Sequence, residues 1–168
     1  LKQIYQSIEA SFPSDEVQIG SWTDKEDKAI VYTSSDVNPG AMYFYDRTKG
    51  NISFIAKSRP WIDSNEMSPM LPISFTARDG LEINGYLTIP KNSDGKNLPL
   101  IVNPHGGPTA RDYWGYNFEH QFFASRGYAV LSMNFRGSTG YGRKHIIEGN
   151  KQWGRKMQDD VTHSVTWE

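Results

Sequence analysis

Apolar and polar residues alternate along the first third of the chain in the way that is typical of β-strands. Four short runs show this pattern, separated by turn sequences rich in Asp, Asn, Pro and Gly: Val17–Thr23, Ala29–Ser35, Ala41–Arg47 and Ile52–Ser58. Short strands with tight connections predict an antiparallel, four-stranded meander. Such a meander is one blade of a β-propeller, and it is equally a piece of a sandwich or a barrel.

Helical spacing is visible at the start of the chain, at Leu1, Ile4, Tyr5 and Ile8. Phe12-Pro13 ends this predicted helix, because proline cannot continue it. After the meander, Ser58–Pro72 contains three prolines and shows little periodicity. This stretch is predicted to be a linker.

The second half of the chain alternates between strand-like and helix-like segments. Ile73–Pro90 predicts a hairpin whose turn is Asp79-Gly80. It is followed by a strand, a helix, a second strand and a last helix, predicted at Leu100–Val102, Phe118–Ser125, Ala129–Asn134 and from about Gln158 onward. This order predicts an α/β domain with parallel strands and right-handed crossovers. The last helix reaches Glu168 before any strand returns, so we expect a truncated sequence.

The composition is that of a globular protein, with 37% hydrophobic and 22% charged residues. A net charge of −1 argues against a partner that is nucleic acid or an anionic membrane. No apolar run approaches the ~18 residues that span a bilayer. The chain has no cysteine, which excludes a disulfide framework and a thiolate metal site and fits a reducing, cytoplasmic location. The chain begins at Leu1 without a signal-like segment. Because it also begins without Met, we expect an internal fragment.

Two adjacent glycines, Gly106 and Gly107, follow the apolar run Leu98–Val102 and stand between His105 and Pro108. Ligands of α/β sheets collect beyond the carboxyl ends of strands. A loop without Cβ atoms at that place can aim backbone N–H groups at a developing oxyanion, each worth about 2.7–4 kcal/mol in acyl-transfer sites. The alternative is a tight structural turn in which His105 packs locally.

The other polar and aromatic candidates have structural alternatives. The four histidines form neither an H-E-x-x-H motif nor an i,i+4 pair, so no metal site is expected. Three of them are expected to be helix-surface or packed residues: His120, His145 and His163. The glycine-rich segment 137–142 matches no nucleotide-binding motif, and no cofactor is expected. Three aromatic residues either line a pocket or pack in the fold: Trp114, Tyr116 and Phe118.

Arg136 ends a predicted parallel strand, where a guanidinium can hold a peptide carbonyl or carboxylate of a substrate. A structural ion pair is the favoured alternative for this residue. Asp159 and Asp160 suit the positive end of the last helix, which explains both without a catalytic role.

Three motifs in a fixed order carry a resemblance to a known family. "HGGP", "ASRGYAVLSMNFRGSTGYG" and "NKQWGRKMQDDV" resemble the prolyl oligopeptidase family of serine peptidases, especially its acylaminoacyl-peptidase and dipeptidyl-peptidase-like branch. The stretch from "SSDVNPGAMYFYDRTKG" to "SRPWID" is similar to the end of that family's propeller. The resemblance implies a mixed fold. We therefore expect residues 1–70 to be the C-terminal blade of a β-propeller plus a linker. Residues 71–168 are expected to be the N-terminal part of an α/β-hydrolase, doubly wound and mostly parallel, truncated before the nucleophile elbow.

The resemblance also implies roles for the glycine loop. Gly106 and Gly107 are expected to shape the oxyanion hole, with the N–H of Gly107 as the preferred donor. His105 is expected to shape the loop without being the catalytic histidine. The family needs a G-x-S-x-G elbow followed by Asp and His. No serine here qualifies, and Ser138 has Gly140 two places after it but Arg136 two places before it. The triad is therefore expected beyond Glu168, and this chain alone is expected to be inactive.

The resemblance implies that the intact parent hydrolyses short peptides through an acyl-enzyme. An esterase or lipase is the nearest alternative, because HGG loops serve both kinds of enzyme. A second alternative is a binding or scaffold relative that kept the fold and lost catalysis. The fragment itself is expected to self-associate through uncovered strand edges.

Overall fold

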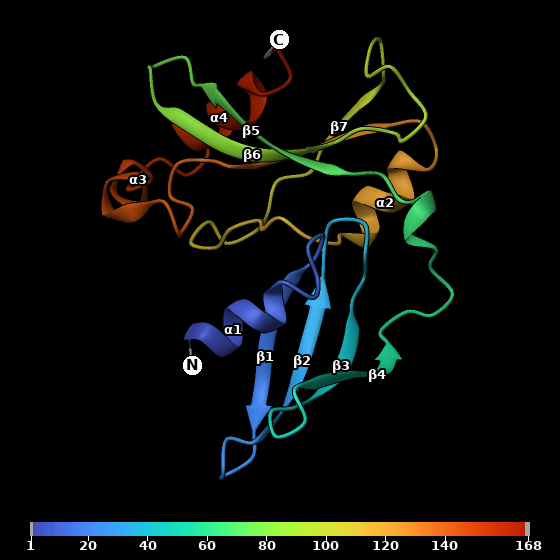
Figure 1. Ribbon diagram of the computed structural model, residues 1–168. Helices are drawn as coiled ribbons and strands as arrows, with labels where there is room; N and C mark the ends of the chain where they lie inside the picture. The colour runs from blue at the N-terminus through green and yellow to red at the C-terminus, as the bar shows by residue number, and fades with distance from the viewer. Residues whose placement is uncertain (1, 167–168) are drawn as a thin grey trace. The chain divides into compact units, whose positions relative to one another are not determined.

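The computed structural model describes residues 2–166 of the 168-residue chain (Figure 1). They form two compact units. One contains the residues up to Met67 together with Gly115–Asn117, and the other contains Ser68–Trp114 and the residues from Phe118 onward. The sequence predicts a propeller end at 1–70 and a hydrolase start at 71–168. That two compact units exist does not show which fold family each belongs to, so this division stays a prediction.

The first unit is an antiparallel sheet whose four strands pair in the order of the sequence (Figure 1). The strands are β1 (Glu16–Trp22), β2 (Lys28–Ser34), β3 (Ala41–Asp46) and β4 (Asn51–Lys57). Helix α1 (Lys2–Glu9) precedes them, and a 3-10 turn, η1 (Ser64–Glu66), follows them. The predicted meander is confirmed, with strand ends that differ by at most one residue from those expected.

Helix α1 is held to the sheet by packing. Ile8 is fully buried in a cluster with residues from alternate positions of three strands: Val17, Ala29, Val31 and Tyr45. The hydroxyl group of Tyr5 also donates to the carbonyl oxygen of Val17 at 2.9 Å. A helix of eight residues is too short to be stable alone. The burial of Ile8, worth about 1.5–3 kcal/mol, therefore helps to keep it folded.

The second unit contains a mixed sheet. Its described strands are β5 (Met70–Thr76), β6 (Glu82–Thr88), β7 (Leu100–Val102) and β8 (Ala129–Asn134), in the spatial order β5-β6-β8-β7. β6 pairs antiparallel with β5 and with β8, whereas β7 and β8 are parallel. The hairpin at Asp79-Gly80 is confirmed. A mostly parallel, doubly wound sheet stays a prediction, because only one of these three pairings is parallel.

Helices follow the parallel strands. α2 (Phe118–Ala124) connects β7 to β8 and packs against β8 and β6. α4 (Lys156–His163) begins two residues before the predicted start at Gln158. α3 (Gly142–Glu148) was not predicted, since the glycine-rich sequence indicated only a loop. The predicted helix positions Leu1, Trp167 and Glu168 lie outside the described residues.

The core of the second unit lies between the sheet and α4. Its buried members are Phe75, Ala77, Ile83, Leu131, Met133, Phe135 and Met157. Leu131, Met133 and Phe135 occupy alternate positions along and just after β8, so they share one face of the sheet. Across residues 2–166, no helix has the length and apolar character needed to cross a membrane.

Candidate functional site

The glycine loop lies where two parallel strands end. β7 ends at Val102, and Asn103-Pro104 leads directly to His105, while β8 ends at Asn134 and is followed by Phe135. Because β7 and β8 are parallel, both segments leave the sheet at the same edge. The imidazole ring of His105 stacks on the ring of Phe135, with centroids 4.5 Å apart. The loop therefore occupies the edge at which α/β proteins bind their ligands.

Gly107 is required by its backbone conformation and by its neighbours. Its φ of 139° lies in the region that side chains rarely adopt. A Cβ atom at this position would lie 2.9 Å from the backbone nitrogen of Thr109 and 3.2 Å from the Cβ of Ala110. The Cβ position of Gly106, by contrast, has no atom within 4 Å. The peptide bond between Gly107 and Pro108 is cis.

The N–H groups of this loop are available to a ligand. Within residues 2–166, the backbone N–H groups of Gly106 and Gly107 donate no hydrogen bond to a protein acceptor. Both glycines are exposed. Exposed N–H groups at the end of a strand can bind an oxyanion without first breaking another hydrogen bond. This geometry is compatible with the predicted oxyanion hole, whose role stays a prediction.

A pocket of about 400 Å³ opens beside the loop. Its walls come from the loop, from the end of β8 and from the segment around the start of α4: Pro104, His105, Gly107, Pro108, Phe135, Trp153, Gly154, Met157, Gln158 and Val161. Most of this lining is apolar, and the side chains of His105 and Gln158 add polar groups. The volume is in the range of small-ligand sites, about 300–1,000 Å³. The pocket can therefore accept an apolar group next to the free N–H donors.

The part of the loop beyond the glycines is fastened to the end of β8. The side chain of Asn134 accepts from the N–H of Asp112 at 2.8 Å and donates to its carbonyl oxygen at 3.2 Å. The N–H of Thr139 donates to the carbonyl oxygen of Ala110 at 2.9 Å. Burial raises the pKa of the Asp112 carboxyl above its usual 3.8, although nearby His105 opposes this effect. These bonds fix the loop on the C-terminal side of the glycines.

Arg136 is buried in an ion-pair cluster. Its guanidinium donates to both carboxylate oxygens of Asp79 at 2.8 Å, and to those of Asp160 at 2.7 and 2.8 Å. Asp79 and Asp160 raise the pKa of Arg136 above its ordinary value, and Arg136 together with Lys156 lowers the pKa of Asp79 below 3.8. This geometry supports the structural ion pair over substrate contact. Asp160 was expected to suit the positive end of the last helix. It lies instead beyond the first turn of α4, as a buried partner of Arg136.

Two of the three histidines outside the loop are enclosed by protein, whereas His163 is half-buried. His120 is 1% exposed, and its ring nitrogens lie 2.9 Å from the hydroxyl oxygens of Thr88 and Ser132. Burial lowers the pKa of His120 to about 4. His145 is buried as well, with Nε2 3.0 Å from the carbonyl oxygen of Phe135. Both are packed residues rather than helix-surface ones. In the described part of the chain, no group of His, Asp and Glu side chains could hold a metal ion.

The remaining candidates lie apart from the pocket lining. Ser138 is fully buried, and its hydroxyl oxygen contacts Nε2 of His105, so it is closed to a substrate. Trp114, Tyr116 and Phe118 do not line the pocket beside the glycines. The indole N–H of Trp114 instead donates to the carbonyl oxygen of Met70 at 2.9 Å.

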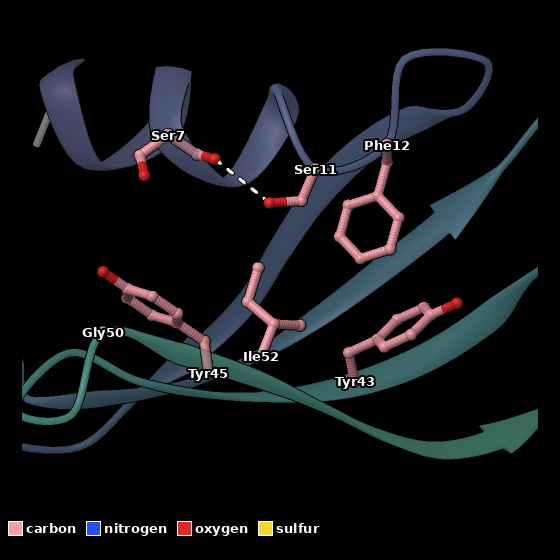
Figure 2. A pocket seen from close by; sticks show the side chains of 7 residues that line it. All are labelled: Ser7, Ser11, Phe12, Tyr43, Tyr45, Gly50 and Ile52. Carbon is pink, nitrogen blue, oxygen red and sulfur yellow. Dashed lines mark hydrogen bonds between the residues drawn. The ribbon is translucent and has the colours of Figure 1, made fainter.

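A second pocket of about 400 Å³ lies in the first unit. Figure 2 shows Tyr43, Tyr45 and Ile52 pointing from the strands toward the segment that carries Ser7 and Ser11. Its lining offers aromatic rings and hydroxyl groups but no carboxylate, imidazole or amine. It therefore lacks the acid–base groups of a hydrolytic site, and the pocket at the glycine loop is the candidate site.

Sequence reasoning missed the walls of that pocket. Phe135 and Trp153 come from segments far along the chain from the glycines, and no local pattern marks them. Met157 and Val161 are four residues apart on α4, which indicates a buried helix stripe but not what the stripe faces. The sequence favoured a structural ion pair for Arg136, but its partners Asp79 and Asp160 were missed for the same reason.

Known relatives cover almost the whole of this chain. Residues 114–167 match the prolyl oligopeptidase family. The chain is 38% identical to dipeptidyl aminopeptidase BIII of Pseudoxanthomonas mexicana, over 96% of this chain and 24% of that protein. It is 33% identical to dipeptidyl peptidase family member 6 of Caenorhabditis elegans, over 91% of this chain and 24% of that protein. The chain thus spans about a quarter of the length of these relatives.

Solved structures agree with these sequence matches. A puromycin-hydrolyzing peptidase of Mycobacterium tuberculosis superposes with a TM-score of 0.70 at 25% identity, over 83% of this chain and 22% of that one. The acylaminoacyl peptidase of Pyrococcus horikoshii superposes with a TM-score of 0.66 at 24% identity, over the same shares, and shows the fold alone. With the three motifs in their expected order, these findings establish that the chain belongs to the prolyl oligopeptidase family of serine peptidases.

Proposed function

We propose that this chain supplies the oxyanion hole of a serine peptidase that hydrolyses short peptides, of the dipeptidyl-peptidase or acylaminoacyl-peptidase type. The observation that carries the proposal is the free N–H of Gly107, at the carboxyl edge of β7 and beside an apolar pocket. The names of the relatives, which are dipeptidyl peptidases and acylamino-acid-releasing enzymes, support the substrate class.

The domain division belongs to the same proposal. Residues 1–70 are the last blade of a propeller with its linker, and residues 71–168 are the first part of an α/β-hydrolase. The four-stranded meander of the first unit and the parallel β7–β8 pair of the second support this division. In the parent protein, a propeller would exclude large substrates and leave the site to short peptides.

The proposed reaction is acyl transfer through a serine. A serine hydroxyl attacks the scissile carbonyl carbon, the carbonyl oxygen becomes an oxyanion, and the amine leaves with a proton; water then hydrolyses the acyl-enzyme. The N–H of Gly107 donates to the oxyanion, which stabilises the transition state by about 2.7–4 kcal/mol. No serine of this chain has G-x-S-x-G around it. The Ser-Asp-His triad is therefore proposed to lie outside residues 1–168, and the chain alone to be inactive.

The test uses the natural polypeptide that contains these residues, with short peptides as substrates. Gly107→Ala forces a Cβ against Thr109 and turns the donor away, so kcat should fall by at least about 10²-fold. The matched control is Gly127→Ala, which also places alanine at a positive φ, of 89°, but meets no atom within 4 Å. The control should keep its activity.

Two outcomes favour other functions. Faster hydrolysis of acyl esters than of any peptide by the natural polypeptide would identify an esterase or lipase. If it cleaves neither class of substrate, the fold assignment stands and a binding or scaffold role replaces the enzymatic one. Full peptidase activity of Gly107→Ala would remove the glycine loop from the mechanism.

A further inference from the structure

A buried hydroxyl group holds the histidine of the glycine loop. Ser138 is fully buried, and its Oγ lies 2.8 Å from Nε2 of His105. Nδ1 of the same ring lies 2.8 Å from the carbonyl oxygen of Gly106. One face of the ring stacks on Phe135 at an interplanar angle of 14°. The imidazole is therefore held at both nitrogens and on one face.

The partners of the two ring nitrogens fix where the proton lies in the neutral imidazole. A carbonyl oxygen can only accept, so Nδ1 of His105 must carry the hydrogen that it donates to Gly106. Nε2 is then the acceptor, and the hydroxyl group of Ser138 donates to it. Ser138 thus stabilises the tautomer that can hold the Gly106 carbonyl.

The Gly106 carbonyl and the Gly107 N–H belong to one peptide group. This group is planar, and in its trans form the N–H points away from the C=O. A hydrogen bond that fixes the direction of the carbonyl therefore also fixes the direction of the N–H. Two glycines give this peptide group wide conformational freedom, and nothing lies within 4 Å of the Cβ position of Gly106. The bond from His105 thus restrains an otherwise loosely held donor.

We propose that Ser138 and His105 are positioning residues that aim the N–H of Gly107 at the oxyanion. The inference rests on the proposed function. The anchor is firm, because Ser138 follows a strand whose residues are all buried, and its own N–H donates to the carbonyl oxygen of Phe135 at 3.0 Å. The next residue, Thr139, holds Ala110 on the other side of the glycines.

The pair is not a nucleophile and its base. The hydroxyl group of Ser138 is closed to solvent, and its sequence surroundings lack the first glycine of an elbow. Nδ1 of His105 faces a backbone carbonyl, whereas a catalytic base of this kind has a carboxylate there to stabilise the imidazolium.

The experiment compares Ser138→Ala with Thr88→Val in the natural polypeptide. Both substitutions remove a buried hydroxyl group that bonds a histidine ring, since Thr88 contacts Nδ1 of His120 at 2.9 Å. Ser138→Ala misaligns an oxyanion donor without touching the substrate, so kcat should fall about 10–100-fold with KM within about threefold of wild type. Thr88→Val should keep its kcat.

A second measurement distinguishes a change in the orientation of the Gly107 N–H from a loss of protein stability. A peptide aldehyde forms an oxyanion with the catalytic serine, whereas a product peptide does not. Ser138→Ala should weaken aldehyde inhibition by the same factor as kcat/KM and leave product inhibition unchanged. His105→Phe keeps an aromatic ring on Phe135 but has no ring nitrogen, so it should repeat both changes, even if Ser138→Ala does not fold.

The outcomes distinguish the inference from the function on which it rests. If the wild type cleaves peptides and both Ser138→Ala and His105→Phe have the kcat of the wild type, the positioning role is overturned and the proposed function stays in place. Equal losses in aldehyde and product affinity would make the pair merely structural, which also overturns it. A wild type that cleaves neither peptides nor esters overturns the proposed function and the positioning role together.

Discussion

Asp160→Asn removes one charge from the buried ion pair that joins α4 to the end of β8. Asp160 accepts three hydrogen bonds from Arg136: two from the guanidinium at 2.7 and 2.8 Å and one from the backbone N–H at 3.1 Å. Asn has nearly the same shape as Asp, so the substitution tests charge and hydrogen bonding more than packing. Its amide NH₂ group would also face the donors of Arg136.

The burial of the pair sets the size of the effect. The side chains of Arg136 and Asp160 are 2% and 1% exposed, so water cannot replace the lost carboxylate. Breaking a buried pair from one side costs about 3–5 kcal/mol. We expect the lower end, about 3 kcal/mol, because Asp79 still neutralises the guanidinium. Asp79→Asn should cost only about 1 kcal/mol, since the Asp79 side chain is 36% exposed and solvent screens its charge.

Hydrogen exchange of peptides from β8 and α4 measures the free energy of opening these elements, and urea unfolding gives the global value. The control is Asp159→Asn, on the exposed side of the same helix, which should change stability by no more than about 0.5 kcal/mol. If Asp160→Asn costs no more than Asp159→Asn, or no more than Asp79→Asn, the inference from burial to energy is refuted.

Two further predictions concern stability in the second unit. Because burial lowers the pKa of His120 from 6.5 to about 4, the unfolded chain binds the extra proton between these pH values. The contribution of neutral His120 to the free energy of unfolding should therefore be fully present above pH 6.5 and fall by on the order of 3 kcal/mol toward pH 4. In urea titrations, the free energy of unfolding of His120→Asn should depend less on pH over that range. A Cβ at Gly85 would lie 2.5 Å from the backbone oxygen of Ser132, so Gly85→Ala should cost about 1–3 kcal/mol in thermal unfolding. Gly20→Ala should cost clearly less, because the atoms that crowd its Cβ belong to the movable ring of Tyr32 and the backbone oxygen of Ile30 is at an ordinary 3.6 Å.

The strands of the first unit were predictable because local chemistry determines them. Alternating apolar residues face α1 and the core, and turn sequences such as Asn38-Pro39-Gly40 separate the runs. The hairpin at Asp79-Gly80 follows the same rule, with Gly80 at a φ of 89°. Neither feature needs a contact from a distant part of the chain, so one sequence was enough.

Helix α3 could not be predicted, because its pattern of burial is inverted. Ile146 and Ile147 are exposed, whereas the polar His145 is buried. His145 bonds the carbonyl oxygen of Phe135, and the N–H of Gly137 donates to the carbonyl oxygen of His145. The helix is thus held by polar contacts with a neighbouring segment, and its sequence has no amphipathic stripe that would predict it.

The polar residues that support the candidate site share one strand. Along β8 and just after it, every second residue is polar: Ser132, Asn134, Arg136 and Ser138. Such alternation normally indicates a strand with one face in water. All four residues are nevertheless at most 2% exposed. Because a buried polar group must find a partner, each one marks a segment that has to come to this strand.

Each of these four residues holds a different segment. Ser132 donates to the carbonyl oxygen of Asn103 at the start of the glycine loop, and Asn134 binds the backbone of Asp112 at its end. Arg136 joins the β5–β6 turn to α4, and Ser138 holds His105. The four polar residues are visible in the sequence. Their partners lie too far along the chain to be identified from the sequence alone. The signal that leads to this site is therefore a polar residue at every second position of a strand that is buried on both faces. This signal can be recognised only once the burial of the strand is known.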